Sequence, residues 1–407
     1  MGTKTYTATS FFDADSVIAS FTSQGLKDIP DSSHATVGFL YCDSQVDYVG
    51  VVEKLSALVS FPIVGGTTMG LPFDNTPHDS TDDMSAMLLV IEREGMRVSV
   101  QASEKLNHAQ HTEQMNALYA KTCEELGEEP KIAMLFLPLL PGIPLSDFMD
   151  DIFVCAGDIP VFGGTSTNDL ISTQAAVFHN GESLHDKLVL VLIGGNVRPV
   201  CASSCQVTPM VEYAPTVSQV EGNEVLRVDS SSFCDYMRDI GLNPEDRVSG
   251  VDALMQYGPT PVLVDTGEAG KTDVPEIRCI SYTDLERGSG MFSAAVAEGA
   301  KIYMSILRQQ DVIDSARECL SKLEERMTPA RQEGYEYTAF FCVTCVARYF
   351  VQVGGSNKEK EFLMDNIPAG CHPTGLYAFC EIGPVYSAKD GFLQNRSHSG
   401  SITMCAF

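Results

Sequence analysis

The hydrophobic pattern along the chain alternates between short apolar runs and segments in which apolar residues recur every three or four positions. Residues 37–42 form a nearly continuous apolar run, whereas in residues 47–60 the apolar side chains return at helical spacing. A run of this length is typical of a buried strand, and the wider spacing is typical of an amphipathic helix. We therefore predict a strand over 37–42, a helix over 47–60 and a glycine-rich loop over 61–70.

This pattern of strand, helix and loop occurs a second time further along the chain. Residues 132–139 are predicted as a strand, 146–157 as a helix and 159–168 as a loop. One constant offset of 98 relates Pro62, Gly65, Gly66 and Thr67 to Pro160, Gly163, Gly164 and Thr165. Repetition at a fixed offset indicates an internal duplication.

Each copy is extended by further predicted elements. A helix precedes it, at 16–24 in the first copy and at about 112–127 in the second. Sequence rich in β-formers follows it, at 84–101 and 186–203, and glycine-containing turn signals within both segments favour hairpins. The repeated unit is therefore helix, strand, helix, loop and strand.

A third and more diverged copy is predicted at the C-terminal end. Its elements are a helix over 311–326, a strand over 337–351, a short helix over 358–366, a loop over 370–384 and a final strand over 401–407. Between the second and third copies we expect a strand and a helix within 211–246, strands at 261–265 and 277–283, and a hairpin over 290–306. The predicted fold class is α/β, with the repeated units forming two mixed-sheet domains, 1–205 and 206–407.

Composition and charge narrow the classes of function. The 407 residues carry 27 basic and 54 acidic side chains, a net charge of −27, which repels nucleic acid and anionic lipid surfaces. The first residues lack an export signal, and no apolar run approaches the 18 or so residues that span a bilayer. Together with thirteen cysteines, this predicts a cytoplasmic protein that binds neither nucleic acid nor membrane.

The two glycine-rich loops are the first candidate sites. Glycine lets another backbone or a small ligand approach closely, and the neighbouring hydroxyls donate and accept hydrogen bonds. The alternative is that the glycines only permit a tight bend that the hydroxyls cap. Neither loop matches a phosphate-binding motif. The candidate ligand-binding residues here are Gly65, Gly66, Thr67, Thr68, Gly163, Gly164 and Thr165.

The C-terminal copy carries the second set of candidates. Arg348 is predicted within an apolar strand, where a guanidinium needs an anionic partner, and Glu381 could be that partner. An internal Arg348–Glu381 ion pair and a ligand-facing role for either residue remain alternatives. His372 and His398 are kept as candidate ligands for a metal or haem.

Other reactive residue types have structural explanations. Cys342 and Cys345 lie in an apolar strand, which favours buried thiols over a disulfide, a metal site or a thiol enzyme. His108 and His111 are three residues apart in a polar stretch, where an exposed helix face is favoured over a metal pair. No catalytic signature is present, so an enzyme is not indicated.

These motifs, taken in order, resemble the FIST domain family in its N-terminal and C-terminal halves. Residues 61–70 resemble its first motif, 159–168 its second repeat, and 345–348, 372–384 and 393–395 elements of its C-terminal half. The positions that match are Gly65, Thr67, Gly70, Gly163, Gly164, Arg348, Gly375, Tyr377, Glu381, Ile382 and Asn395. Leu71 and Pro72 depart from the family's usual Glu-Ile.

The resemblance implies a sensory module that binds small ligands, amino acids among them, and that passes its signal to a separate partner protein. Some members of the family bind haem and respond to nitric oxide. We therefore expect a non-enzymatic sensor whose ligand lies between the glycine-rich loops and Arg348, Tyr377, Glu381 and Asn395. A haem-binding gas sensor and a scaffold that binds only protein partners are the alternatives, and the oligomeric state is left open.

Overall fold

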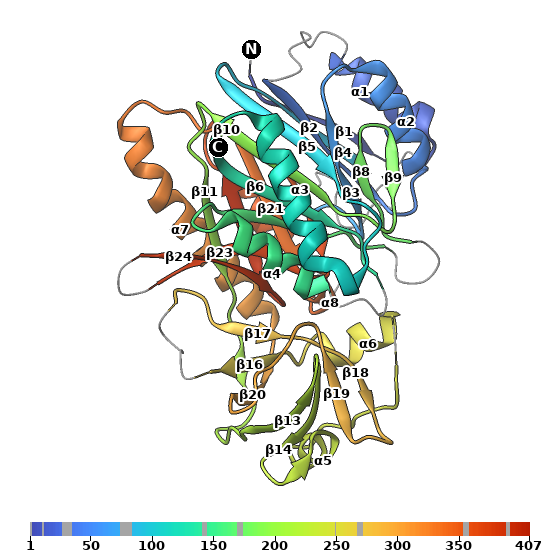
Figure 1. Ribbon diagram of the computed structural model, residues 1–407, viewed down its shortest axis with the longest axis vertical. Coiled ribbons are helices and arrows are strands. Elements are labelled where there is room, and N and C mark those ends of the chain that lie inside the picture. The colour runs from blue at the N-terminus through green and yellow to red at the C-terminus, as the bar shows by residue number, and fades with distance from the viewer. Residues whose placement is uncertain are drawn as a thin grey trace.

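The repeated unit predicted from the sequence is present three times in the computed structural model (Figure 1). The structure describes residues 2–9, 12–26, 35–73, 84–140, 145–168, 174–248, 250–266, 272–352, 358–387 and 391–407. Three sheets with their helices form a larger body, and a smaller body built from residues 208–306 lies below it in Figure 1. The α/β class with mixed sheets is therefore confirmed.

The first repeat supplies most of one six-stranded sheet. Its elements are β1 (Lys4–Thr9), α1 (Ala14–Ser23), β2 (Thr36–Asp43), α2 (Tyr48–Leu58), β3 (Ile63–Thr68) and β4 (Met84–Glu92). The sheet order is β1-β4-β2-β3-β8-β9, in which β8 (Val177–His179) and β9 (Glu182–Leu184) come from the second repeat. Strands β2 and β3 are parallel, as a strand, helix and strand unit requires.

The second repeat forms another six-stranded sheet. Its elements are β5 (Met96–Ala102), α3 (His111–Leu126), β6 (Pro130–Leu137), α4 (Leu145–Ala156), β7 (Val161–Thr165) and β10 (Val189–Gly195). The order is β24-β23-β7-β6-β10-β5, so two strands of the third repeat complete this sheet. The second repeat thus receives strands from the C-terminal part of the chain.

The third repeat forms a four-stranded sheet in the order β11-β25-β21-β22. Its elements are β11 (Val200–Ser204), α7 (Gln309–Gln332), β21 (Ala339–Cys345), α8 (Val346–Phe350), α9 (Lys358–Asp365), β22 (His372–Ala378), β23 (Glu381–Tyr386), β24 (Leu393–His398) and β25 (Ile402–Ala406). The predicted strand over 337–351 ends at Cys345, and the residues after it turn into α8.

The smaller body consists of two sheets that enclose their own core. Its elements are β12 (Thr208–Pro209), β13 (Val217–Glu221), β14 (Glu224–Val228), β15 (Ser231–Ser232), α5 (Phe233–Asp239), α6 (Gly250–Tyr257), β16 (Val262–Asp265), β17 (Glu276–Arg278), β18 (Ile280–Asp284), β19 (Ser289–Phe292) and β20 (Lys301–Ile306). The chain enters this body between β11 and β12, near the predicted division at 205, and returns to the larger body after β20.

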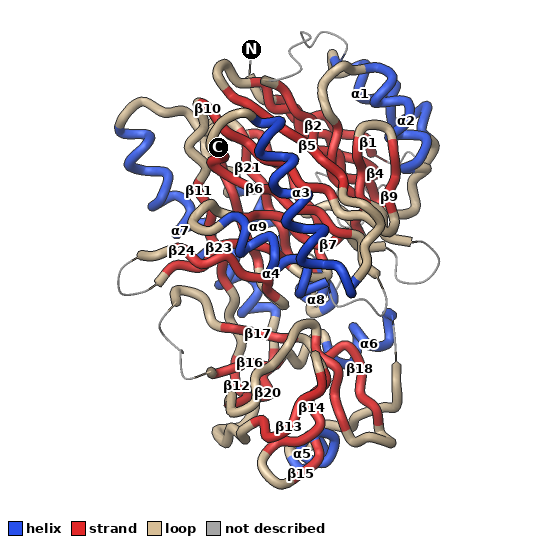
Figure 2. The backbone as a smooth tube through the Cα atoms, in the orientation of Figure 1, coloured by secondary structure: helices blue, strands red, loops and turns tan. Residues whose placement is uncertain are grey.

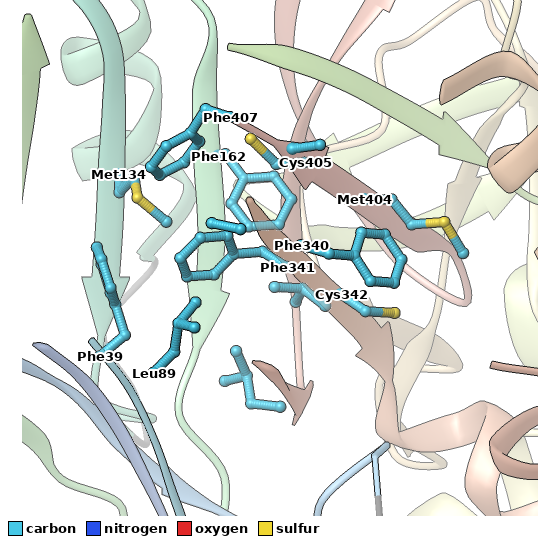
Figure 3. Packing of buried hydrophobic residues seen from close by; sticks show 14 of the residues in the cluster. Phe39, Leu89, Met134, Phe162, Phe340, Phe341, Cys342, Met404, Cys405 and Phe407 are labelled. Carbon is cyan, nitrogen blue, oxygen red and sulfur yellow. The ribbon is translucent and has the colours of Figure 1, made fainter. Parts of the chain in front are cut away.

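One shared core joins the three repeats. Side chains alternate between the two faces of a strand, so β2 directs Phe39 into the shared core and Leu40 beneath its own helices. The helices lie outside the strands (Figure 2). Aromatic rings from all three repeats meet inside, with Phe341 4.8 Å from Phe39 and 6.2 Å from Phe162 between ring centroids (Figure 3). Burial on both faces explains why these strands are almost continuously apolar.

The three predicted hairpins are wrong. Strands β4 and β5 belong to different sheets, as do β10 and β11, and β19 and β20. Gly95 and Gly195 do turn the chain at positive φ, and these two turns lie against each other. Turn residues determine where the chain bends. The sheet that the following strand joins is determined by the core against which its apolar face packs. Among the helices of the described residues, none is long and apolar enough to cross a membrane.

The glycine-rich segments are also strands rather than loops, and close packing explains their glycines. Gly65 in β3 has φ +140, and a Cβ there would lie 1.9 Å from Leu40 O on β2. Gly163 in β7 has φ +147, and its Cβ would lie 2.0 Å from Leu135 O. Gly375 in β22 repeats the close approach, at 2.1 Å from Cys342 O. The same backbone contact therefore recurs in all three repeats.

We predict that Gly163→Ala lowers the free energy of unfolding by about 3 kcal/mol or more, because the new Cβ would combine backbone strain with a collision against Leu135 O. Gly127→Ala is the control, since Gly127 has φ +71 but open space around it, and should cost about 1–2 kcal/mol. Urea denaturation of both variants measures the difference. Equal losses would show that the collision is relieved without cost.

Candidate functional site

The carboxyl ends of β3, β7 and β22 meet, and they are held together by the predicted Thr67 and Thr68 and by Thr167, which was not among the predicted residues. Thr68 Oγ1 accepts a hydrogen bond from Tyr377 N at 3.0 Å, and Thr167 Oγ1 donates to Tyr377 O at 2.8 Å. Thr167 N donates to Thr67 O at 3.1 Å. All of these residues are buried. The two loop motifs and the third repeat are therefore joined at one junction.

The second glycine of each pair allows a segment of a neighbouring repeat to pack closely against it. A Cβ on Gly66 would lie 2.1 Å from Ser166 Oγ, and one on Gly164 would lie 2.9 Å from Cys380 O. Thr165 then fixes the same segment, because its N donates to Cys380 O at 3.0 Å and its Oγ1 accepts from Cys380 N at 2.8 Å. The next residue along, Glu381, is held opposite Gly164.

Glu381 is a fully buried carboxyl group with one unused oxygen. Oε2 accepts hydrogen bonds from Ser401 N at 3.1 Å and from Ser401 Oγ at 2.9 Å. Oε1 accepts no well-formed hydrogen bond from the described residues, although the Cys345 thiol contacts the Glu381 side chain. Burial, and then the neighbouring Cys345 thiol, raise the pKa of Glu381 well above its ordinary value, which favours the protonated form of the group.

Arg348 is also fully buried, but its partner is Glu359 and not Glu381. Arg348 Nε lies 2.9 Å from Glu359 Oε1, and a terminal guanidinium nitrogen lies 2.5 Å from the same oxygen. Its other donors reach Ser315 Oγ at 2.8 Å and Val312 O at 2.8 Å. The predicted Arg348–Glu381 ion pair is therefore wrong, and the guanidinium has no donor left over for a ligand.

Arg348 and Glu381 nevertheless contact the same turn between β24 and β25. Arg348 donates to Gly400 O at 3.4 Å, and Glu381 accepts from the adjacent Ser401. Cys205 Sγ lies 3.1 Å from Gly400 O as well. The turn between Gly400 and Ser401 therefore links the ion pair to the buried carboxyl group.

Thiols and hydroxyls of both bodies line this region. Cys279 of the smaller body hydrogen-bonds Cys345 of the larger one, and that bond together with burial raises the pKa of Cys345 well above its ordinary value. Ser293 Oγ and Ser399 Oγ make a second contact across the junction, at 2.8 Å. A thiol with a raised pKa is a poor nucleophile, which does not favour the thiol-enzyme alternative.

The other predicted residues have different surroundings, although His398 is the cross-strand partner of Glu381 in the β23–β24 pair. Asn395 joins β24 to the start of β7, accepting from Val161 N at 2.8 Å and donating to Ile159 O at 2.9 Å. Tyr377 contributes its backbone to the junction, and its buried ring packs on Tyr349. His398 is buried with Nε2 3.0 Å from Gly383 O, and burial lowers its pKa to about 3. His372 is exposed at the start of β22.

Four residues near Glu381 and Arg348 were missed from the sequence: Cys205, Cys279, Glu359 and Ser401. Glu359 lies in the segment KEKEF, whose charges are typical of an exposed helix. The other three are small polar residues with no distinguishing motif. The apolar neighbours of Arg348 were the only signal that a buried anion was needed, and they did not say which one.

Two family models match this chain. The FIST N domain model matches residues 36–231, and the FIST C domain model matches residues 245–384. No curated protein matches the chain by sequence.

Two solved structures show remote likenesses. The cyanuric acid hydrolase described under "evolutionary innovation by structural concatenation" is 8% identical with a TM-score of 0.30, over 65% of this chain and 80% of that one. The T. maritima PurL complexed with FGAR is 8% identical with a TM-score of 0.20, over 99% of this chain and 72% of that one. At these TM-scores neither likeness bears on function.

We predict that Arg348→Met lowers the free energy of unfolding by about 3–5 kcal/mol, because Glu359 would remain buried without its partner. The matched control is Arg317→Met, which breaks the exposed Arg317–Asp314 pair and should cost less than about 1 kcal/mol. Chemical denaturation of both variants checks this. Similar losses in the two would mean that the buried pair contributes no more than an exposed one.

We also predict a pH dependence that Glu381→Gln removes. Because the pKa of Glu381 is raised in the folded protein, this group stabilises the fold below its unfolded pKa, and that contribution is lost as the pH rises toward the folded pKa. The unfolding free energy of Glu381→Gln should therefore improve relative to the unmodified protein as the pH rises above 4.5. Urea titrations from there to about pH 8 measure this. Parallel curves would contradict it.

Proposed function

This chain belongs to the FIST family, and we propose from that premise that it is a cytoplasmic sensor of a small amine-bearing metabolite, an amino acid or a similar compound. FIST domains are generally sensory and signal-transduction domains thought to bind small ligands. The proposed role is binding without catalysis, with the signal read by a separate partner protein. Thirteen free thiols support a reducing compartment.

The observation that carries the proposal is the unused Oε1 of Glu381. Buried polar groups are almost always hydrogen-bonded, and an unpartnered one is costly, at about 1–3 kcal/mol. An ammonium group that donates to Oε1 would complete the hydrogen bonds of this carboxyl group once it has ionised. The nearby Ser401 already holds Oε2, so the carboxyl group is fixed in orientation before any ligand arrives.

The location supports a sensory role. Glu381 lies where the two bodies meet, as the Cys279–Cys345 and Ser293–Ser399 contacts show, and ligand sites occur preferentially at such junctions. Because Glu381 is fully buried, a ligand would enter only when the two bodies separate locally. Binding would then favour one arrangement of the smaller body against the larger one over another. A sensor requires that its ligand bind two conformations with different affinities.

The roles of the other predicted residues change accordingly. Arg348 is saturated by Glu359, Ser315 and Val312, so we assign it the positioning of the turn that donates to Glu381. Thr165 positions the segment before Glu381 through both of its bonds to Cys380. The carboxyl group of Glu381 would therefore recognise the ligand, and it would select an amine.

We predict that a thermal-shift panel of amino acids and small amines gives a ligand whose binding releases a proton. Burial favours the protonated form of Glu381, which would have to ionise to hold an ammonium group, so the calorimetric enthalpy should differ between buffers of different ionisation enthalpy. Glu381→Gln should weaken binding about tenfold to a hundredfold, since a hydrogen bond to a charged group contributes about 1.5–3 kcal/mol.

Glu325→Gln, on the exposed face of α7, is the matched control and should bind normally. Binding that survives Glu381→Gln unchanged would move the site elsewhere. A Soret band on addition of haem that disappears in His372→Ala or His398→Ala would favour the gas-sensor alternative instead.

A further inference from the structure

Two histidines and two aspartates are brought together on the surface of the second repeat. His108 lies in the short helix η2 (His108–Gln110), His111 begins α3, and Asp147 and Asp151 lie on α4. Each of His108, His111 and Asp147 offers a ligand atom, and these three atoms lie within 4.8 Å of one another. These histidines face a second helix, not solvent alone as the sequence had indicated.

Helix geometry explains the arrangement. Asp147 and Asp151 are four residues apart and share one face of α4, and the two histidines present themselves to that face. His108 Nε2 lies 2.6 Å from Asp147 Oδ2, and His111 Nδ1 lies 2.5 Å from Asp151 Oδ2. The imidazole rings stack with centroids 5.3 Å apart, and both pack against the buried Phe148.

We propose that His108, His111 and Asp147 form a binding site for a divalent transition-metal ion, with Zn²⁺ the best match. Two imidazole nitrogens and one carboxylate oxygen suit Zn²⁺, whereas Mg²⁺ and Ca²⁺ prefer oxygen ligands alone. Asp151 holds Nδ1 of His111, as carboxylates behind metal-binding histidines commonly do, and His111 would bind the ion through its other ring nitrogen.

The site is open on one side. The side chains of His108 and Asp147 are 48% and 39% exposed, so water or another ligand can occupy the remaining coordination positions. His111 and Asp151 are less exposed, at 30% and 17%, and anchor the cluster against the protein. A site with three protein ligands and an open position is the usual form of an exchangeable zinc site.

The local charge favours a cation. Asp147, Asp150 and Asp151 place three carboxyl groups close together on α4, with Arg278 as a nearby cation. A bound cation would relieve the repulsion between these carboxylates. The amino-terminal dipoles of α3 and α4 oppose a cation only weakly, by about 0.3–1 kcal/mol each, and the three carboxyl groups offset them.

The test is binding of Zn²⁺, or of Co²⁺ as its spectroscopic substitute, to full-length protein freed of metal by a chelator. We expect one equivalent to bind, and the Co²⁺ spectrum should lack thiolate charge-transfer bands although thirteen cysteines are present. Asp147→Asn and His111→Ala should each weaken the affinity more than about 100-fold. Asp151→Asn, which removes only the orienting carboxylate, should weaken it about 10- to 100-fold.

The matched control is Asp15→Asn, which removes an exposed carboxylate in the first turn of α1, outside the cluster, and should leave the affinity unchanged. Circular dichroism of Asp147→Asn, an isosteric change at an exposed position, separates loss of the site from loss of the fold. The proposal is overturned if the metal-free protein binds no Zn²⁺ or Co²⁺, or if the cluster variants bind as tightly as the control. In that case the four residues are two surface ion pairs and nothing more.

Discussion

The shared core is the constraint on which the rest of the larger body depends. Each sheet has helices on one face only, so its other apolar face must be buried against the other two sheets. Phe39, Phe162 and Phe341 come from three different repeats and meet within ring-contact distance. No repeat can bury both faces of its strands by itself, so the three fold around one another and their strands cross between sheets.

That constraint also explains the glycines and hydroxyls that looked like a ligand-binding motif. For three sheets to converge, the carboxyl ends of β3, β7 and β22 must approach closely, and side chains at Gly65 or Gly163 would prevent it. Thr68 and Thr167 then satisfy backbone groups that the convergence would leave without partners. The motif is therefore first a packing device, and it influences the proposed ligand site by holding Glu381 in place.

The sequence predicted the repeating unit and the order of its elements because these depend on local periodicity, which the 98-residue offset between Gly65 and Gly163 makes visible. It failed for strand partners, because Gly95 and Gly195 mark turns without saying which sheet the next strand enters. It did not identify Glu359 as the partner of Arg348, because Glu359 lies among charges typical of a solvated helix. The unused oxygen of Glu381 could not be predicted from the sequence. It depends on which hydrogen-bond donors the fold brings close to this side chain, and local periodicity does not contain that information.

The pairing of β23 with β7 has a consequence for how the protein is made. Gly164 lies opposite Glu381, so the edge of the second repeat's sheet is covered only after more than half of the chain has followed it. During synthesis that edge would remain unpaired, and able to pair with other chains, until the last strands emerge from the ribosome. The segments matched by the two family models are therefore not independent folding units, and a fragment that stops after β11 would carry an aggregation-prone edge.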